Sequence, residues 1–135
     1  EDRKARSRIY SRRMLHFITE HFVDRLESAV LRQRLLCTLM AEALNRRLGR
    51  CAVARKGSDL YDGQAKLTVS IATATPVSTL VHAGINVISA GAPVAARGLE
   101  DYRIDTAEFG REILAAYADE MASVYHARCK ARPGA

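Results

Sequence analysis

One lysine, Lys66, stands within an apolar, β-branched stretch of the chain that runs from Ser58 to Ser89. A buried or half-buried ammonium costs on the order of several kcal/mol unless an anion pairs with it. A lysine at the start of a strand is a compact cation that can bind a carboxylate or phosphate, or stabilise a developing oxyanion. The alternative is that Lys66 extends from a strand edge into solvent and binds nothing.

The histidines do not form a metal site by their spacing. No two of them are four residues apart, and the chain has neither an HExxH nor a CxxC motif. The sequence also lacks GxGxxG, Walker and GxSxG motifs, which argues against dehydrogenases, P-loop enzymes and α/β-hydrolases. His82 lies between Val81 and Ala83 in an expected strand, and we expect a backbone carbonyl to satisfy its ring. The four histidines are His16, His21, His82 and His126.

Cys37, Cys51 and Cys129 are odd in number and widely spaced. This pattern predicts reduced thiols in a cytoplasmic protein and argues against a disulfide framework. Cys51 and Cys129 are candidates for a nucleophile, with inert, buried thiols as the alternative. No stretch approaches the roughly 20 apolar residues of a membrane span, and the charged N-terminus lacks the apolar region of a signal peptide.

Three helices are expected around these residues. Apolar spacing predicts one over 11–22, capped by Ser11, and a longer one from Asp24 to about Leu48, ended by Gly49. A third begins at Thr106 and ends before Pro133. The wide apolar stripe of the second helix predicts that it packs deeply against a sheet.

Strands are expected between the second and third helices. β-branched composition predicts strands over 66–73 and 77–87, separated by Pro76, and weak alternation predicts another over 52–56. Asp62-Gly63 marks a hairpin turn within 61–64, and glycines and Pro93 mark a loop over 91–98. The short connections exclude βαβ crossovers, so we expect an α+β fold whose mixed or antiparallel sheet is packed by helices.

The length of 135 residues predicts a single domain over 1–135 with one core. A net charge of +6 comes largely from the first residues, and we expect 1–10 to be a flexible basic terminus. Such a terminus could also contact nucleic acid or an acidic surface, although no aromatic-rich basic motif accompanies it. The basic residues concerned are Arg3, Lys4, Arg6, Arg8, Arg12 and Arg13.

Four stretches of the chain resemble the uncharacterised family known as domain of unknown function 366. The similar stretches are Met14 to Phe22, Glu27 to Leu44, Asp59 to Val87 and Tyr117 to Pro133. Members of that family are longer at the N-terminus by several strands. The resemblance therefore implies that the N-terminal part of the fold is missing from this chain.

The central stretch is also similar, more distantly, to the catalytic domain of biotin- and lipoate-protein ligases and octanoyltransferases. Asp59-Leu60-Tyr61, Lys66-Leu67, Ile71 and Gly84-Ile85-Asn86 match the pattern of that domain in order. The resemblance implies a ligase-like fold, with ATP as a possible cofactor. The chain departs from the pattern at Ser58, Ala65 and Thr68-Val69, and no stretch matches the Gly/Arg-rich substrate loop.

In those enzymes the lysine that matches Lys66 contacts the acyl carboxylate or the adenylate phosphate. The resemblance thus implies that Lys66 is the catalytic residue and that Asp59, Gly84 and Asn86 bind the ligand. Asp59 would orient Lys66 or a ligand amine, and Asn86 would hydrogen-bond nearby backbone. No metal is expected.

Two functions follow. The first is a small-molecule ligand site, in a ligase or acyltransferase-like enzyme or its degenerate relative, that takes a carboxylate or nucleotide. The second is a non-catalytic interaction module that meets a partner, nucleic acid among them, through its basic N-terminus and long helices. A truncated sheet edge would favour a homodimer.

Overall fold

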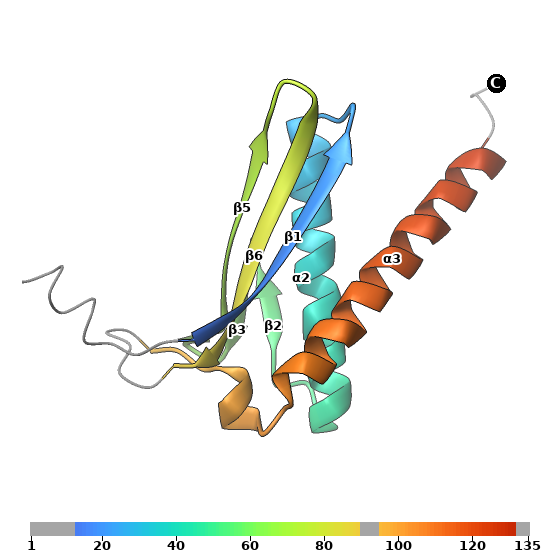
Figure 1. Ribbon diagram of the computed structural model, residues 1–135. Helices are drawn as coiled ribbons and strands as arrows, with labels where there is room; N and C mark the ends of the chain where they lie inside the picture. Colours follow the sequence, from blue (N-terminus) through green and yellow to red (C-terminus); the bar gives the residue numbers. More distant parts are fainter. Residues whose placement is uncertain (1–12, 90–94, 132–135) are drawn as a thin grey trace, which may run out of the picture.

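The structure is a computed structural model that describes residues 13–89 and 95–131, and in it two antiparallel sheets lie beside two long helices (Figure 1). The elements in chain order are β1 (Arg13–Phe22), α2 (Leu26–Leu48), β2 (Ala54–Lys56), β3 (Asp59–Asp62), β4 (Ala65–Lys66), β5 (Thr68–Ala74), β6 (Ser78–Ile88), the short 3-10 helix η1 (Leu99–Tyr102) and α3 (Thr106–Lys130). The basic residues 1–12, including the expected flexible terminus, lie outside the described part, as do Gly91, Pro93 and Pro133.

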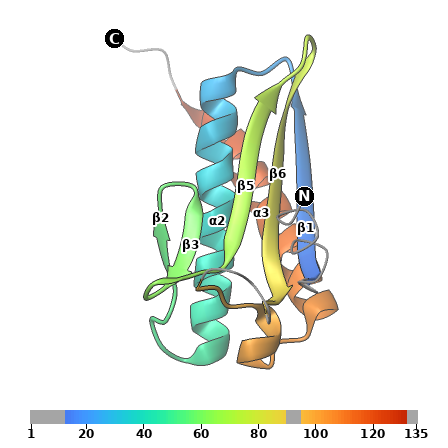
Figure 2. The same cartoon turned by 90° about the vertical axis from the view of Figure 1, so that its left-hand side faces the viewer.

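The larger sheet has the strand order β1-β6-β5, and each pair is antiparallel. β6 is the central strand, with Phe17 of β1 opposite Ala83 on one side and Ser70 of β5 opposite the same residue on the other. The smaller sheet, in the order β2-β3-β4, is a pair of short hairpins beside α2 (Figure 2). Its turn at Gly63, where φ is 60°, confirms the hairpin predicted from Asp-Gly.

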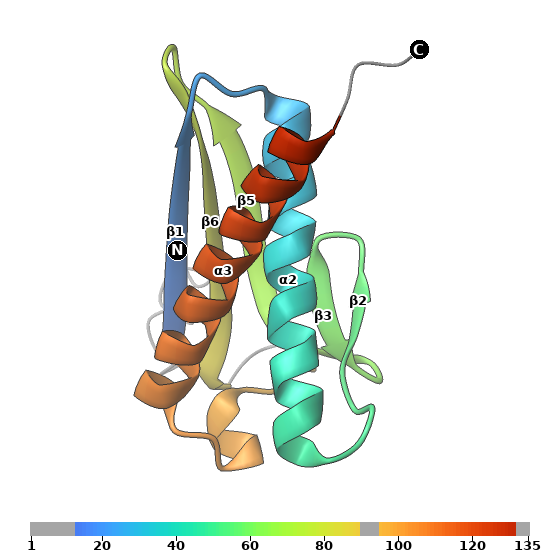
Figure 3. The same cartoon turned by 90° about the vertical axis from the view of Figure 1, so that its right-hand side faces the viewer.

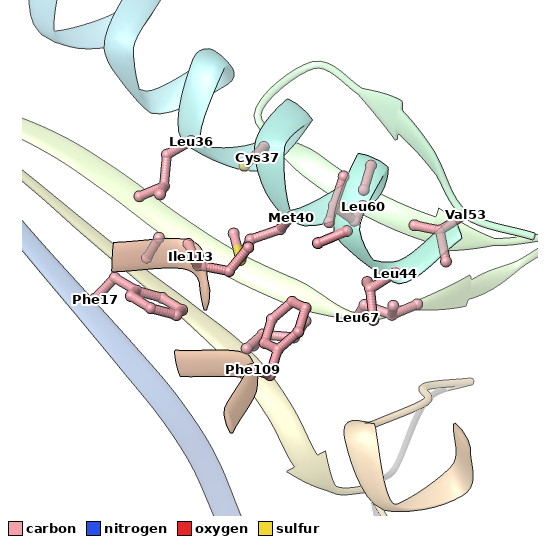
Figure 4. Packing of buried hydrophobic residues seen from close by; sticks show 14 of the residues in the cluster. Phe17, Leu36, Cys37, Met40, Leu44, Val53, Leu60, Leu67, Phe109 and Ile113 are labelled. Carbon is pink, nitrogen blue, oxygen red and sulfur yellow. The ribbon is translucent and has the colours of Figure 1, made fainter. Parts of the chain in front are cut away.

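Both long helices lie on the same side of the larger sheet (Figure 3). Apolar side chains from α2, α3 and the inward face of the sheet form one core, shown in Figure 4. Phe109 and Ile113 of α3 meet Met40 and Leu44 of α2 there, and Phe17 of β1 closes the sheet side. The deep packing predicted for the second helix is therefore confirmed.

The other face of the larger sheet is not covered by any element of the described ranges (Figure 2). Side chains on that face include Ile18 of β1 and Val69 and Ile71 of β5, all of which are exposed. Because side chains alternate along a strand, the same strands bury Phe17 and Thr68 on the helix side.

The helix predicted over 11–22 is wrong, because residues Arg13–Phe22 form strand β1. The apolar residues at 14, 15, 17 and 18 suit a helix by spacing, but burial follows a period of two. Phe17 is 4% exposed and the adjacent Ile18 is 65% exposed. Pairing with β6 runs along the whole strand on one edge, so tertiary context overrides the local pattern.

The second helix begins at Leu26 instead of Asp24, and it ends as predicted before Gly49, which is left-handed with φ of 71°. Asp24 is engaged elsewhere, because its carboxylate accepts hydrogen bonds from Arg32 and Thr79. The third helix begins at Thr106 as predicted. Asp105 caps it by accepting from the Glu108 amide at 2.9 Å.

The Asp24 carboxylate joins helix α2 to the sheet. Arg32 of α2 donates to both of its oxygens, and the Thr79 hydroxyl of β6 donates to Oδ2 at 2.6 Å. The hydrogen bonds from Arg32 are the main reason that the pKa of Asp24 falls to about 2. A carboxylate held in this way contributes stability only while it is ionised.

No helix within 13–89 and 95–131 is long and apolar enough to cross a membrane.

We expect Asp24→Asn to lower the free energy of unfolding at neutral pH and to flatten its dependence on acid. In the unfolded chain the carboxyl titrates near 3.8 and in the folded chain near 2, so its contribution is present above 3.8 and is lost as pH falls toward 2. Urea unfolding measured across this range checks the difference. Asp119→Asn, at an exposed position of α3, is the control and should retain the wild-type pH dependence.

We expect Phe109→Ala to destabilise the protein by about 3–5 kcal/mol, because Phe109 is fully buried between the helices and the sheet. Leu114→Ala on the same helix is the control, and its exposed side chain predicts a change within about 0.5 kcal/mol. Equal losses for the two variants would contradict the assignment of the core. Denaturant unfolding followed by circular dichroism measures both.

Candidate functional site

Lys66 lies at the end of β4, where two backbone hydrogen bonds hold it against the segment that follows β6. Its amide donates to the Ala95 carbonyl at 3.2 Å, and its carbonyl accepts from the Arg97 amide at 3.2 Å. On the β3 side it is opposite Tyr61. Lys66 therefore has a fixed backbone between β3 and the segment 95–97.

The side chain of Lys66 pairs with Asp59. Nζ lies 3.5 Å from Asp59 Oδ2, and the two side chains are 39% and 25% exposed. The other oxygen of Asp59 accepts from the Thr68 hydroxyl at 3.0 Å, and the Leu60 amide donates to that hydroxyl at 3.0 Å. This anchors the carboxylate and directs its second oxygen to the ammonium.

An ion pair at this exposure contributes little to stability, typically about 0–1 kcal/mol. The pair is more informative about which groups the ammonium contacts. An ammonium has three N–H donors, and Asp59 is the one carboxylate recorded beside Nζ among the described residues. The Lys66 ammonium is thus held beside one carboxylate while 39% of the side chain remains exposed.

Asn86 binds backbone from both sides of the site. Its Nδ2 donates to the Lys66 carbonyl at 3.2 Å and to the Arg97 carbonyl at 3.1 Å. Asn86 is buried, with 5% of its surface exposed. The resemblance to ligases implies that Asn86 bonds nearby backbone, and these two hydrogen bonds are of that kind. Asn86 therefore connects the end of β6 with the backbone of Lys66 and of Arg97.

Gly98, expected only as part of a loop, lies close to the backbone at the end of β6. A Cβ at this position would lie 2.6 Å from the Val87 carbonyl oxygen and 2.9 Å from that of Asn86. Its amide donates to Asp101 Oδ2 at 2.9 Å, which fixes the start of η1. Only the isolated glycine itself signals this close approach in the sequence.

Gly84 lies apart from the lysine, in the middle of β6. It lines a groove of about 230 Å³ on the open face of the sheet, together with Val69, Ile71 and others. The structure thus gathers Asp59, Lys66 and Asn86 at one end of β6 and places the fourth predicted residue in a neighbouring groove. The complete lining consists of His16, Val69, Ser70, Ile71, His82 and Gly84.

The prediction that a backbone carbonyl satisfies His82 is wrong. His82 is exposed on the open face, and its Nε2 lies 2.9 Å from Nδ1 of His16. The two rings are close to perpendicular, at 70°, with centroids 4.9 Å apart. The pair could not be foreseen while His16 was assigned to a helix, because only strand pairing brings β1 beside β6.

The cysteines separate into one buried and two exposed thiols. Cys37 is buried in α2 and donates to the Ser58 carbonyl at 3.1 Å, and burial raises the pKa of its thiol to about 11. A thiol with so high a pKa is a poor nucleophile at neutral pH. Cys51 and Cys129 are exposed.

Comparisons with known proteins identify the family and the fold. A family model described as "Domain of unknown function (DUF366)" matches residues 1–132. An uncharacterized protein of Methanocaldococcus jannaschii is 39% identical over 123 residues, which cover 89% of this chain and 55% of that protein. The structure of a protein of unknown function from Pyrococcus horikoshi has a TM-score of 0.83 and 36% identity, covering 90% of this chain and 65% of that one.

More distant structures are ligases. A biotin protein ligase mutant from Aquifex aeolicus in complex with biotin has a TM-score of 0.66 at 18% identity, covering 81% of this chain and 50% of the ligase. A proposed lipoate protein ligase from T. acidophilum with bound lipoic acid has a TM-score of 0.60 at 14% identity, covering 81% and 52%. At such identities the likeness concerns the fold alone. It confirms the α+β, ligase-like architecture, and the chain spans about half to two thirds of the length of the proteins it matches.

We expect Asn86→Ala to cost about 1–3 kcal/mol of unfolding free energy, because the Lys66 and Arg97 carbonyls lose the donor that they share, the amide of a buried residue. Exchange of the Lys66 and Arg97 amides with solvent should also accelerate, since the segment 95–97 is less firmly held. Hydrogen exchange and urea unfolding measure the two effects. Gln64→Ala, in the exposed turn, should change neither, and unchanged exchange in Asn86→Ala would contradict the inference that Asn86 holds the segment 95–97.

Proposed function

The chain belongs to the family described as domain of unknown function (DUF366), and from its ligase-like fold and its lysine site we propose that it binds a small carboxylate ligand through Lys66. The ligand is an acyl acid, free or as its adenylate. Binding is the primary step of the proposal, and transfer of the acyl group is the reaction that such a site would serve.

The observation that carries the proposal is the ion pair of Lys66 with an anchored Asp59. Because Thr68 holds one oxygen of Asp59, the carboxylate cannot follow the ammonium freely when an anion approaches. Lys66 can therefore add a ligand carboxylate to its coordination while it keeps its orientation. A compact, strongly hydrated ammonium is suited to this role as a point charge.

The backbone around Lys66 supports the same reading. Its peptide unit is bonded on both sides to the segment 95–97, and Asn86 bonds its carbonyl. A rigid backbone lowers the entropy cost of fixing the side chain on a ligand.

The ligands of the similar structures supply the chemical class. The Aquifex ligase has been solved with biotin and with biotin and ATP, and the T. acidophilum protein with lipoic acid. Biotin and lipoic acid are both carboxylic acids that carry an apolar chain. A cation that neutralises such a carboxylate, or the charge that develops when it is activated, performs a role that electrostatic catalysis requires.

We expect biotin, lipoate or octanoate to raise the melting temperature of the wild type and Lys66→Met to abolish the rise. A ligand at 100 times its dissociation constant stabilises the folded state by about 2.7 kcal/mol, which a thermal-shift measurement resolves. ATP is tested alone and with each acid, since an adenylate site should show a larger shift for the combination.

Lys56→Met is the matched control, because Lys56 is an exposed lysine of the neighbouring strand β2. It should retain the full ligand-induced shift. Asp59→Asn should weaken the shift without abolishing it, since the ammonium remains but loses its anchor. No shift with any of the three acids, or an equal shift in Lys66→Met, would refute the proposal.

A further inference from the structure

We propose that His16 and His82 together bind one divalent transition-metal ion of the class that prefers imidazole, such as Zn²⁺, Cu²⁺ or Ni²⁺. The site is on the open face of the larger sheet and is independent of the carboxylate site at Lys66. Imidazole nitrogen suits these ions, and neutral histidine is their commonest protein ligand.

The spacing of the two nitrogens fits an ion. Nδ1 of His16 and Nε2 of His82 are 2.9 Å apart. At metal–nitrogen distances of about 2.0–2.1 Å, two neighbouring ligands of an octahedral or tetrahedral ion are separated by about 2.9–3.4 Å. Both rings must turn so that their lone pairs, which lie along the line between the nitrogens in the hydrogen-bonded pair, converge on a shared ion.

The protons of the two rings allow this exchange. In the hydrogen-bonded pair one of the facing nitrogens donates and the other accepts, so one facing nitrogen already presents a lone pair. When the donating ring moves its proton to its outward nitrogen, both facing nitrogens become ligands. Each neutral ring keeps one proton throughout, and the ion replaces only the hydrogen bond.

The backbone holds the two rings at this position. β1 and β6 are paired along their length, with His16 opposite Gly84 and Ile18 opposite His82. The two histidines are thus diagonal neighbours across two strands of the sheet, one of them the central strand. A site built on paired strands changes shape less than a site on a loop.

Gly84 makes the room that His16 needs. A Cβ at position 84 would lie 3.1 Å from both Cε1 and Nδ1 of His16 and 2.9 Å from the methyl carbon of Met14. Since Nδ1 is the proposed ligand atom, a side chain at this position would displace it. The glycine therefore has a reason to be present in the middle of a strand, where it otherwise weakens the fold.

The site would leave positions of the ion open. No group of three or more histidine, cysteine, aspartate or glutamate side chains that could hold an ion is found in the described part of the chain, so the described residues supply two ligands. The groove of about 230 Å³, which both histidines line, leaves space for the other ligands. Water or a small ligand with oxygen or nitrogen donors would complete the coordination, as at metal sites that retain an exchangeable position.

The hydrogen bond between His16 and His82 adds little to the stability of the fold. Both histidines are exposed, and water competes for their nitrogens, so the bond contributes about 0.5–1.5 kcal/mol at most. Fold stability therefore does not require two facing imidazoles above a glycine. Binding of a metal ion would explain why His16, His82 and Gly84 occur together.

Titration calorimetry with Zn²⁺ tests the proposal on the untagged chain. Exposed thiols also bind zinc, so the experiment uses a Cys51→Ser, Cys129→Ser background. We expect saturable binding of one Zn²⁺ per chain. His16→Gln and His82→Gln should each weaken Zn²⁺ binding. Loss of an outer-shell partner already weakens metal binding roughly tenfold to hundredfold, so loss of a ligand should weaken it at least as much.

His126→Gln is the matched control, because His126 is exposed on α3, away from the pair. It should bind Zn²⁺ as the parent does, and Gly84→Ala should weaken binding although no ligand is removed. Circular dichroism confirms that each variant is folded, and electron paramagnetic resonance with Cu²⁺ should show nitrogen ligands that disappear in the double histidine variant. Absence of saturable Zn²⁺ binding, or an equal loss in His126→Gln, would overturn the proposal.

Discussion

The pairing of β6 on both of its edges is the constraint on which the other features of the structure depend. β6 is bonded to β1 along one edge and to β5 along the other. An extended backbone at the centre of a sheet must have its amides and carbonyls paired on both sides, because burial without partners is costly. This requirement determines the register of both neighbours, and with it which side chains face the helices and which face the open side.

Both candidate sites derive from this strand. At its end, Asn86 extends the pairing beyond the sheet by bonding the carbonyls of Lys66 and Arg97. In the middle of β6, His82 lies beside His16, and the lack of a side chain at Gly84 leaves space for the His16 ring. The side chains of the two candidate sites thus differ in chemistry, and both sites depend on strand β6. The core on the opposite side of the sheet, which includes Phe109 and Met40, packs the sheet against the helices.

Local composition was sufficient to predict several elements and insufficient for others. The strands on either side of Pro76, the hairpin turn at Gly63 and the helix end at Gly49 have strong local signals, and the structure has them within about two residues. The segment 13–22 has apolar residues at a spacing that fits a helix, and only its partner strand, about 60 residues away along the chain, decides in favour of β. That error concealed the His16–His82 pair, because the two histidines meet only through strand pairing. The grouping of Asp59, Lys66 and Asn86 was predictable from resemblance, whereas the close approach of Gly98 depends on backbone positions that residue types do not reveal.

The lysine site and the sheet are not held with equal strength. β6 is enclosed by neighbours along its length, whereas segment 95–97 is joined to Lys66 through two backbone bonds and to β6 through the Asn86 amide. Regions with few buried contacts open at lower free energy than a sheet interior. On warming, the frame around Lys66 should therefore open while the sheet and helices are still folded. The temperature at which the protein loses its proposed ligand site would then lie below the temperature at which it melts, and storage or assay conditions chosen from the melting curve alone would overestimate its working range.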